Sequence, residues 1–151
     1  MSSVNQILVQ KDKDCKSVWF MRQAGRYLPE FRKIRSQNKN FINLCLNSSL
    51  STEITLQPIK RFNLDAAIIF SDILLVPYAL GQEVNFTKDL GPVLNRFSVK
   101  KFSKFNKAQF IKKLSPVYEA IENTRKKLNK NKSLISFIGA PWTLLVYMMG
   151  L

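Results

Sequence analysis

The 151-residue sequence contains no histidine and only two cysteines. The missing histidine excludes a Ser/His or Cys/His catalytic pair and any His-ligated metal within this chain. Cys15 and Cys45 are far apart and have no metal-ligand partner at a suitable spacing, so we expect free thiols. No apolar run approaches the roughly 20 residues that span a bilayer. The amino-terminal residues lack the apolar core and cleavage site of a signal peptide, which predicts a cytoplasmic protein.

Acidic residues are also scarce. The sequence has ten acidic residues and 24 lysines and arginines, so the formal net charge is +14. Such a charge fits three kinds of polyanionic partner: a nucleic acid, an acidic membrane surface or a small molecule. Many of the lysines lie between residues 100 and 132 beside asparagines, where we interpret them as compositional bias on a solvated surface. The hydrophobic fraction of 46% indicates a packed globular protein.

Three short apolar runs predict buried strands at residues 18–21, 66–70 and 134–138. A continuous apolar run is typical of a parallel strand that is covered on both faces. The clearest amphipathic helix is expected over residues 106–129. The other expected elements are helices over residues 28–37, 51–62 (N-capped by Ser51) and 144–149, apolar segments over 41–46 and 73–80, a hairpin with arms 84–86 and 93–97 around residues 89–92, and a leader of little pattern over residues 1–17.

The alternation of strands and helices indicates parallel β/α units and therefore an α/β fold. A full (β/α)8 barrel needs about 250 residues. If the units belong to such a barrel, only about the first three are present. We see no linker or internal repeat, so residues 1–151 are expected to form part of a single barrel domain.

Each of the three predicted strands ends in a distinctive turn. The first turn holds Arg22 and Arg26, the second holds Asp72, and the third covers residues 139–143, with Tyr147 about one helical turn further on. In parallel β/α folds, ligands bind at the carboxyl ends of the strands. We therefore expect the three turns to converge on one binding site.

Each of these residues also has a purely structural interpretation. Two arginines at a strand end can be solvated surface charges, and Asp72 can be a helix cap or a surface carboxylate. Tyr147 can pack in the core with its hydroxyl satisfied. Their joint position at three predicted strand ends favours the binding site.

Three motifs in this order resemble the uroporphyrinogen decarboxylase family. They are WFMRQAGRYLPE at residues 19–30, FSDIL at 70–74 with Val-Pro and Leu-Gly shortly after it, and GAPWTL at 139–144 followed by Tyr147. The resemblance runs from about residue 8 to residue 151. It implies a (β/α)8 barrel, a homodimer, and neither metal nor cofactor. It also implies a carboxy-lyase of porphyrin and haem biosynthesis, which removes the four acetate carboxyls of uroporphyrinogen III to give coproporphyrinogen III.

The resemblance also implies roles for individual residues. Asp72 would be the catalytic carboxylate, facing the pyrrole N–H groups of the macrocycle and stabilising the cationic ring that forms on protonation. The two arginines would pair with substrate carboxylates, with the turn amides adding donors to the same anion. The implied substrate-binding residues are Arg22, Gln23, Ala24, Gly25, Arg26, Asp72 and Tyr147, and no metal ligand is implied.

The chain departs from the family pattern in what it lacks. The family has a histidine near its carboxyl terminus and a serine in mid-chain, and this chain has no histidine and is much shorter. Residues 148–151 also differ from the acidic residue and glycine of the family. We therefore interpret the chain as an amino-terminal portion of the enzyme and expect no activity from it alone.

Two other functions fit parts of the sequence. A cobamide-dependent methyltransferase of the same barrel superfamily would bind zinc through histidine and cysteine residues, and no such cluster is present. A basic nucleic-acid-binding module would explain the net charge and the lysines of residues 100–132. The sequence favours it less, because the aromatic residues do not alternate with the basic ones as a stacking platform requires.

Overall fold

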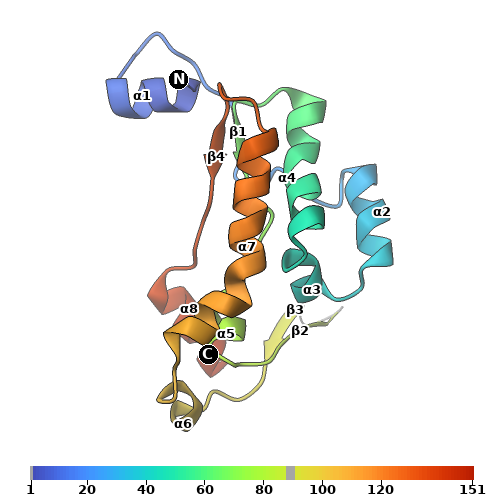
Figure 1. The fold of residues 1–151 in the computed structure, drawn as a ribbon, viewed down its shortest axis with the longest axis vertical. Helices are drawn as coiled ribbons and strands as arrows, with labels where there is room; N and C mark the ends of the chain where they lie inside the picture. The colour runs from blue at the N-terminus through green and yellow to red at the C-terminus, as the bar shows by residue number, and fades with distance from the viewer. Residues whose placement is uncertain (1, 88–90) are drawn as a thin grey trace.

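The computed structural model describes residues 2–87 and 91–151. Two long helices, α4 (Ser48–Phe62) and α7 (Lys107–Lys127), lie side by side in front of a short parallel sheet (Figure 1). The sheet pairs β1 (Ala66–Ile68) with β4 (Ser133–Ile135), and Ala66 lies opposite Ser133. The predicted α/β class is therefore confirmed, and two of the three predicted strands form.

The remaining elements surround this centre. The antiparallel hairpin of β2 and β3 confirms the predicted hairpin, although residues 88–90 of its expected turn lie outside the described residues. The further elements are α1 (Ser3–Gln10), α2 (Pro29–Gln37), α3 (Phe41–Cys45), α5 (Leu75–Ala79), β2 (Val84–Thr87), β3 (Gly91–Leu94), α6 (Val99–Phe102) and α8 (Pro141–Met149). In Figure 1, α1 lies at one end of the molecule and α6 at the other.

The predicted helices form with small shifts of their ends. Helices α2, α7 and α8 match the predictions within a few residues. Helix α4 begins earlier than expected, because the Asn47 side chain accepts a hydrogen bond from the Leu50 amide at 3.0 Å and so acts as the N-cap. Ser51 lies within the helix, which corrects its predicted role. Helix α1 was missed, since its residues show only a short apolar pattern.

The predicted strand at residues 18–21 is wrong. Its backbone contacts the sheet region only at Val18, which exchanges hydrogen bonds with Asp65 just before β1. Phe20 and Met21 are 62% and 78% exposed. Among the described residues, no neighbouring element covers these side chains, so the run lacks the burial that holds an apolar strand in a parallel sheet.

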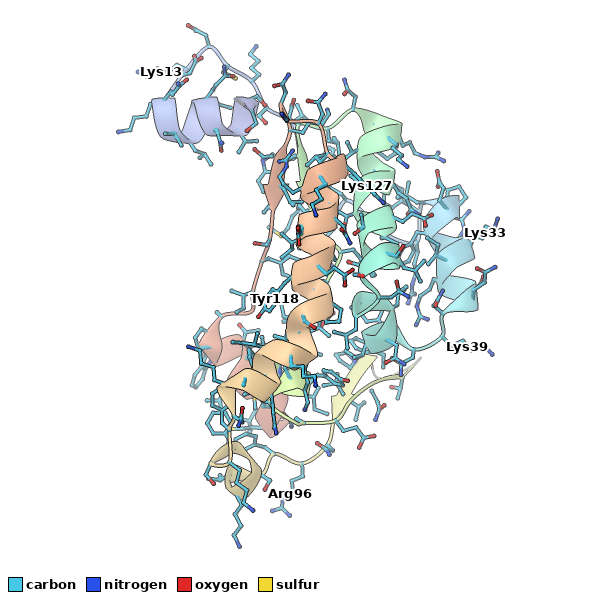
Figure 2. All side chains as sticks on the ribbon, viewed as in Figure 1. Lys13, Lys33, Lys39, Arg96, Tyr118 and Lys127 are labelled. Atoms are coloured by element: carbon cyan, nitrogen blue, oxygen red, sulfur yellow. The ribbon has the colours of Figure 1, made fainter. Side chains whose placement is uncertain are left out.

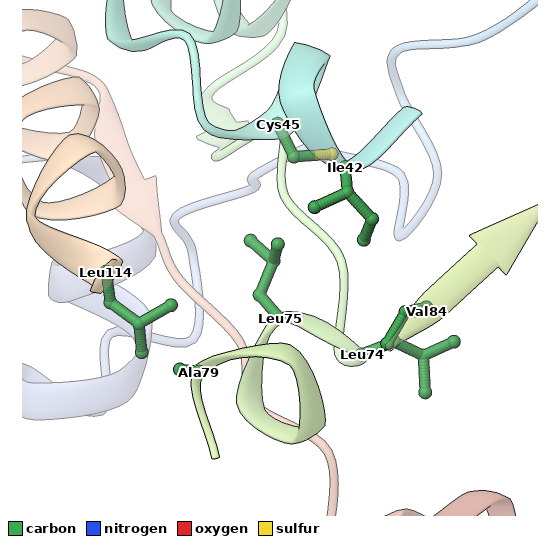
Figure 3. Close-up of a cluster of buried hydrophobic side chains, with 7 residues drawn as sticks. All are labelled: Ile42, Cys45, Leu74, Leu75, Ala79, Val84 and Leu114. Carbon is green, nitrogen blue, oxygen red and sulfur yellow. The ribbon is translucent and has the colours of Figure 1, made fainter. Parts of the chain in front are cut away.

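A buried apolar cluster lies around the segment that follows β1 (Figure 3). Leu74 and Leu75 enter it from that segment, Cys45 from α3, and Leu114 from α7. Such packing fixes the position of the residues around it, because core side chains have little free volume to move into. None of the helices in the described part of the chain is both long and apolar enough to cross a bilayer.

Candidate functional site

Asp72 lies in the turn that follows β1, as the sequence predicted. Its Oδ1 accepts a hydrogen bond from the Leu74 amide at 2.8 Å, so the carboxylate caps its own turn. The side chain is half-buried, and this burial raises the pKa of Asp72 above its usual value, opposed by the hydrogen bond from Leu74. Burial disfavours the charged form of this carboxylate, which hydrogen-bond donors on a ligand would stabilise.

Helix α4 holds the chain two residues before Asp72. The Ser51 hydroxyl donates to the Phe70 carbonyl at 2.6 Å, and the Phe70 amide donates to the Thr55 hydroxyl at 2.8 Å. Both α4 residues are buried. This pair of bonds gives the backbone at Phe70 the partners that a strand neighbour would otherwise supply, and so positions the Asp72 turn.

The second and third turns lie together. Gly139 packs against Ile73, and a Cβ placed on the glycine would lie 3.1 Å from the Ile73 Cβ. A cavity of about 240 Å³ lies beside this contact, lined by Asp72, residues 136–138 and mostly apolar side chains of α7. Small-molecule sites commonly measure about 300–1,000 Å³. The cavity beside Asp72 is therefore smaller than a usual small-molecule site.

The arginine turn is held beside the opposite end of β1. The buried Gln23 side chain donates from Nε2 to the carbonyl of Ala66, the first residue of that strand, at 2.9 Å. Tyr27 closes the same turn by donating its hydroxyl to the Gln23 carbonyl and stacks on Phe62, with ring centroids 6.2 Å apart. The expected convergence is therefore met by the second and third turns, and the first is attached at the amino end of the strand.

The residues assigned to substrate binding differ in their surroundings. Arg22 and Arg26 are exposed, and Tyr147 is 41% exposed on α8. Gln23 is only 4% exposed and points to the strand, so its side chain serves as a tether in this structure and not as an open ligand contact. Ala24 packs against the apolar cluster that contains Leu28 and Phe31.

Sequence reasoning missed three residues near Asp72. Ser51 was predicted to be an N-cap and Thr55 was not singled out, although two hydroxyls on successive helical turns can indicate a buried polar contact. Cys45 lies in the apolar cluster, and its pKa is raised mainly by burial and further by the charge of Asp72. The thiol therefore stays protonated beside the carboxylate. Among the described residues, no group of His, Cys, Asp and Glu side chains could hold a metal ion.

The fold is shared with a solved methyltransferase from Methanosarcina mazei. The superposition has a TM-score of 0.71 and covers 97% of this chain and 44% of that one, at 16% sequence identity. An identity this low shows only that the two proteins share a fold. The methyltransferase alternative gains no support from it beyond that fold.

The sequence comparisons are more specific. The model of the uroporphyrinogen decarboxylase (URO-D) family matches residues 2–151. The uroporphyrinogen decarboxylase of Rickettsia felis is 50% identical over 132 residues, which are 87% of this chain and 38% of that protein. The enzymes of Rickettsia rickettsii and Rickettsia africae are 50% and 52% identical over 91% and 87% of this chain.

This chain belongs to the uroporphyrinogen decarboxylase family. It spans about two fifths of the length of the curated relatives that it matches.

Proposed function

We propose that this chain is the amino-terminal portion of a (β/α)8 barrel enzyme that decarboxylates uroporphyrinogen to coproporphyrinogen. The observation that carries the proposal is the position of Asp72, a half-buried carboxylate at the carboxyl end of a parallel strand in a member of this family. That is the end of the strand at which barrel enzymes bind their substrates.

The chemistry needs a fixed negative charge under the macrocycle. Protonation of a pyrrole ring creates a cation, the bond between the acetate methylene and its carboxylate breaks, and the electron pair flows into the protonated ring as CO2 leaves. A proton then adds to the methylene carbon and gives a methyl group, and loss of the first proton from the ring restores the neutral pyrrole. Asp72 would accept hydrogen bonds from the pyrrole N–H groups and stabilise the cationic ring.

The arginine turn would bind the carboxylates of the substrate. A guanidinium offers a planar fork of donors that matches a carboxylate and keeps its charge at physiological pH. Arg22 and Arg26 are exposed, so both are free to reach a polyanion at low desolvation cost. In the complete site, both arginines would contact the same substrate as Asp72, and the hydroxyl of Tyr147 would add a donor from α8.

The rest of the barrel would complete the site and the homodimer that the family resemblance implies. The cavity beside Asp72 is small for a macrocycle, and the chain matches only about 40% of the length of its relatives. Decarboxylation by the isolated chain is therefore not expected.

A chimera tests the proposal. The 132 matched residues of the Rickettsia felis decarboxylase would be replaced by the corresponding residues of this chain, and coproporphyrinogen formation would be measured without added metal or cofactor. We expect turnover by the chimera and none by the isolated chain. A chimera that melts as cooperatively as its parent but forms no coproporphyrinogen would refute the proposal.

A further inference from the structure

One surface of the molecule is basic and apolar at once. Residues 91–118 contain no acidic side chain, and Arg96 and several lysines lie among them. We define the α6 knob as the side chains of Val99, Lys100, Phe102, Lys104, Phe105 and Lys107, which are all exposed. In Figure 1, helix α6 lies at the lower end of the molecule, and Figure 2 shows Arg96 pointing outward there.

The apolar side chains of the α6 knob are unusually open. Val99 is 70% exposed, Phe102 is 47% exposed and Phe105 is 51% exposed. Each ring is supported on one side, because Phe102 packs on Phe97 at 6.0 Å and Phe105 packs on Phe110 at 5.8 Å between ring centroids. Each ring therefore packs on a neighbouring ring on one side and is open to solvent on the other. Lysine-rich composition alone explains the charges but not these exposed rings.

Among the described residues, no carboxylate forms an ion pair with the positive charges of the α6 knob. The ion pairs within the described residues join Arg61 to Glu30 and Lys126 to Glu122, both away from the knob. An uncompensated basic surface attracts a polyanion. A second copy of the chain would bring like charges together if it met the knob face to face, so a symmetric self-contact is disfavoured.

We propose that the α6 knob binds the surface of an anionic membrane. Lysine ammonium groups would contact the lipid phosphates, while Phe102, Phe105 and Val99 enter the boundary between headgroups and acyl chains. The aliphatic Val99 is the most exposed of the three, and it suits acyl chains but cannot stack on a nucleic-acid base. The site is separate from the proposed decarboxylase chemistry and does not depend on it.

The structure also corrects an argument made from the sequence. Aromatic residues do alternate with basic ones in this surface, since Phe102 and Phe105 lie between Lys100 and Lys107 and are exposed. Single-stranded RNA is therefore the competing partner that a test has to exclude.

Vesicle sedimentation with the full chain tests the proposal. The chain would be mixed with neutral phosphatidylcholine vesicles and with vesicles that contain about 30% phosphatidylglycerol. We expect binding to the anionic vesicles only, with a steep loss as salt is raised. In a Phe105→Trp variant, lipids brominated in the acyl chain should quench the added fluorescence beyond the quenching seen with the unsubstituted chain.

Two pairs of matched variants distinguish binding by the α6 knob from non-specific binding by other exposed basic or apolar side chains. Lys100→Glu with Lys104→Glu should weaken binding about tenfold or more, whereas Lys11→Glu with Lys13→Glu makes the same charge change at the opposite end and should weaken it far less. Phe102→Ser with Phe105→Ser removes the rings and should also weaken binding to the anionic vesicles. Leu8→Ser with Val9→Ser, both 72% exposed in the starting chain, is the apolar control.

Several results would overturn the proposal. These are failure to bind anionic vesicles, equal losses in the knob variants and their matched controls, and tighter binding of single-stranded RNA that depends on Phe102 and Phe105. A concentration-dependent dimer that is lost in the knob variants would show instead that a second copy covers the surface. All substituted side chains are exposed, so circular dichroism should show an unchanged fold.

Discussion

The Asp72 turn and the arginine turn carry the opposite charges of the proposed site, and the two turns differ in burial and in how they are anchored. Asp72 is half-buried beside an apolar cluster, with its backbone held by two hydroxyls of α4. Arg22 and Arg26 are exposed, whereas Gln23 between them is anchored by its bond to Ala66. The negative charge is therefore fixed before substrate arrives, whereas the positive charges remain in solvent.

This difference matches what each charge would have to do. A carboxylate that stabilises a transient cation works best when it is already oriented and partly removed from water, since it then needs no rearrangement during the reaction. Arginines that collect a polyanionic substrate work from the surface, where ionic attraction is long-ranged and costs little desolvation.

The largest effect is expected for Asp72→Ala in the active chimera. Removal of a preorganised charge at the reacting group should lower kcat about 100-fold or more. Asp12→Ala is the matched control, because Asp12 Oδ1 also accepts from the amide two residues on, at 3.0 Å, but lies in the exposed amino-terminal region. Unchanged kcat in the Asp72 variant would remove this residue from the mechanism.

The arginines should affect binding more than chemistry. Arg22→Gln and Arg26→Gln are each expected to raise KM about tenfold with little change in kcat, because each removes a charge-assisted contact that is present before and during the reaction. Lys33→Gln removes an exposed charge from α2 and should leave KM unchanged. A loss of kcat equal to that of the Asp72 variant would show that the two turns do not differ in role.

Gln23 should behave as a tether. Gln23→Leu removes the buried bond to the Ala66 carbonyl and should lower the free energy of unfolding by about 1 kcal/mol. The exposed Gln37→Leu is its control, and chemical denaturation measures both. In the chimera, the loosened turn should raise KM while the pH profile stays the same. A raised KM with no loss of stability would instead favour direct contact between Gln23 and substrate.

The smallest effect concerns the stability cost of Asp72. Burial raises the folded-state pKa of Asp72, so the folded chain binds this proton more tightly than the unfolded chain does. The free energy of unfolding therefore falls as pH rises through the interval between the two pKa values. Asp72→Asn keeps the acceptor for the Leu74 amide and should raise Tm by about 2 °C at pH 7, with a smaller gain near pH 4. A lower Tm at pH 7 would contradict this cost.

The sequence predicted the parts of the fold that rest on local pattern. The period of α7, the proline at the start of α2 and the apolar run of β1 all indicated the right elements. The run at residues 18–21 has the same composition as a buried strand, but strand formation needs neighbours on both sides, and a local pattern carries no information about them.

The sequence predicted which residues belong to the candidate site, but it did not predict how they are arranged in space. Ile73, next to Asp72, packs against Gly139, so the second and third turns meet as expected after paired parallel strands. Gln23 was assigned to substrate because it lies in the first motif of the family resemblance, and only the structure shows its bond to Ala66. The support from Ser51 and Thr55 depends on contacts across 15 or 19 residues, which no spacing rule reveals.

The most direct test is to measure activity and stability together in Asp72→Asn, with Asp12→Asn as control. Asparagine removes the charge but keeps the size of the side chain and the hydrogen bond to the Leu74 amide. We predict that the Asp72 variant of the chimera loses turnover about 100-fold while the same change in the isolated chain raises Tm at pH 7. Full turnover in the folded Asp72→Asn chimera would contradict the central role of this carboxylate.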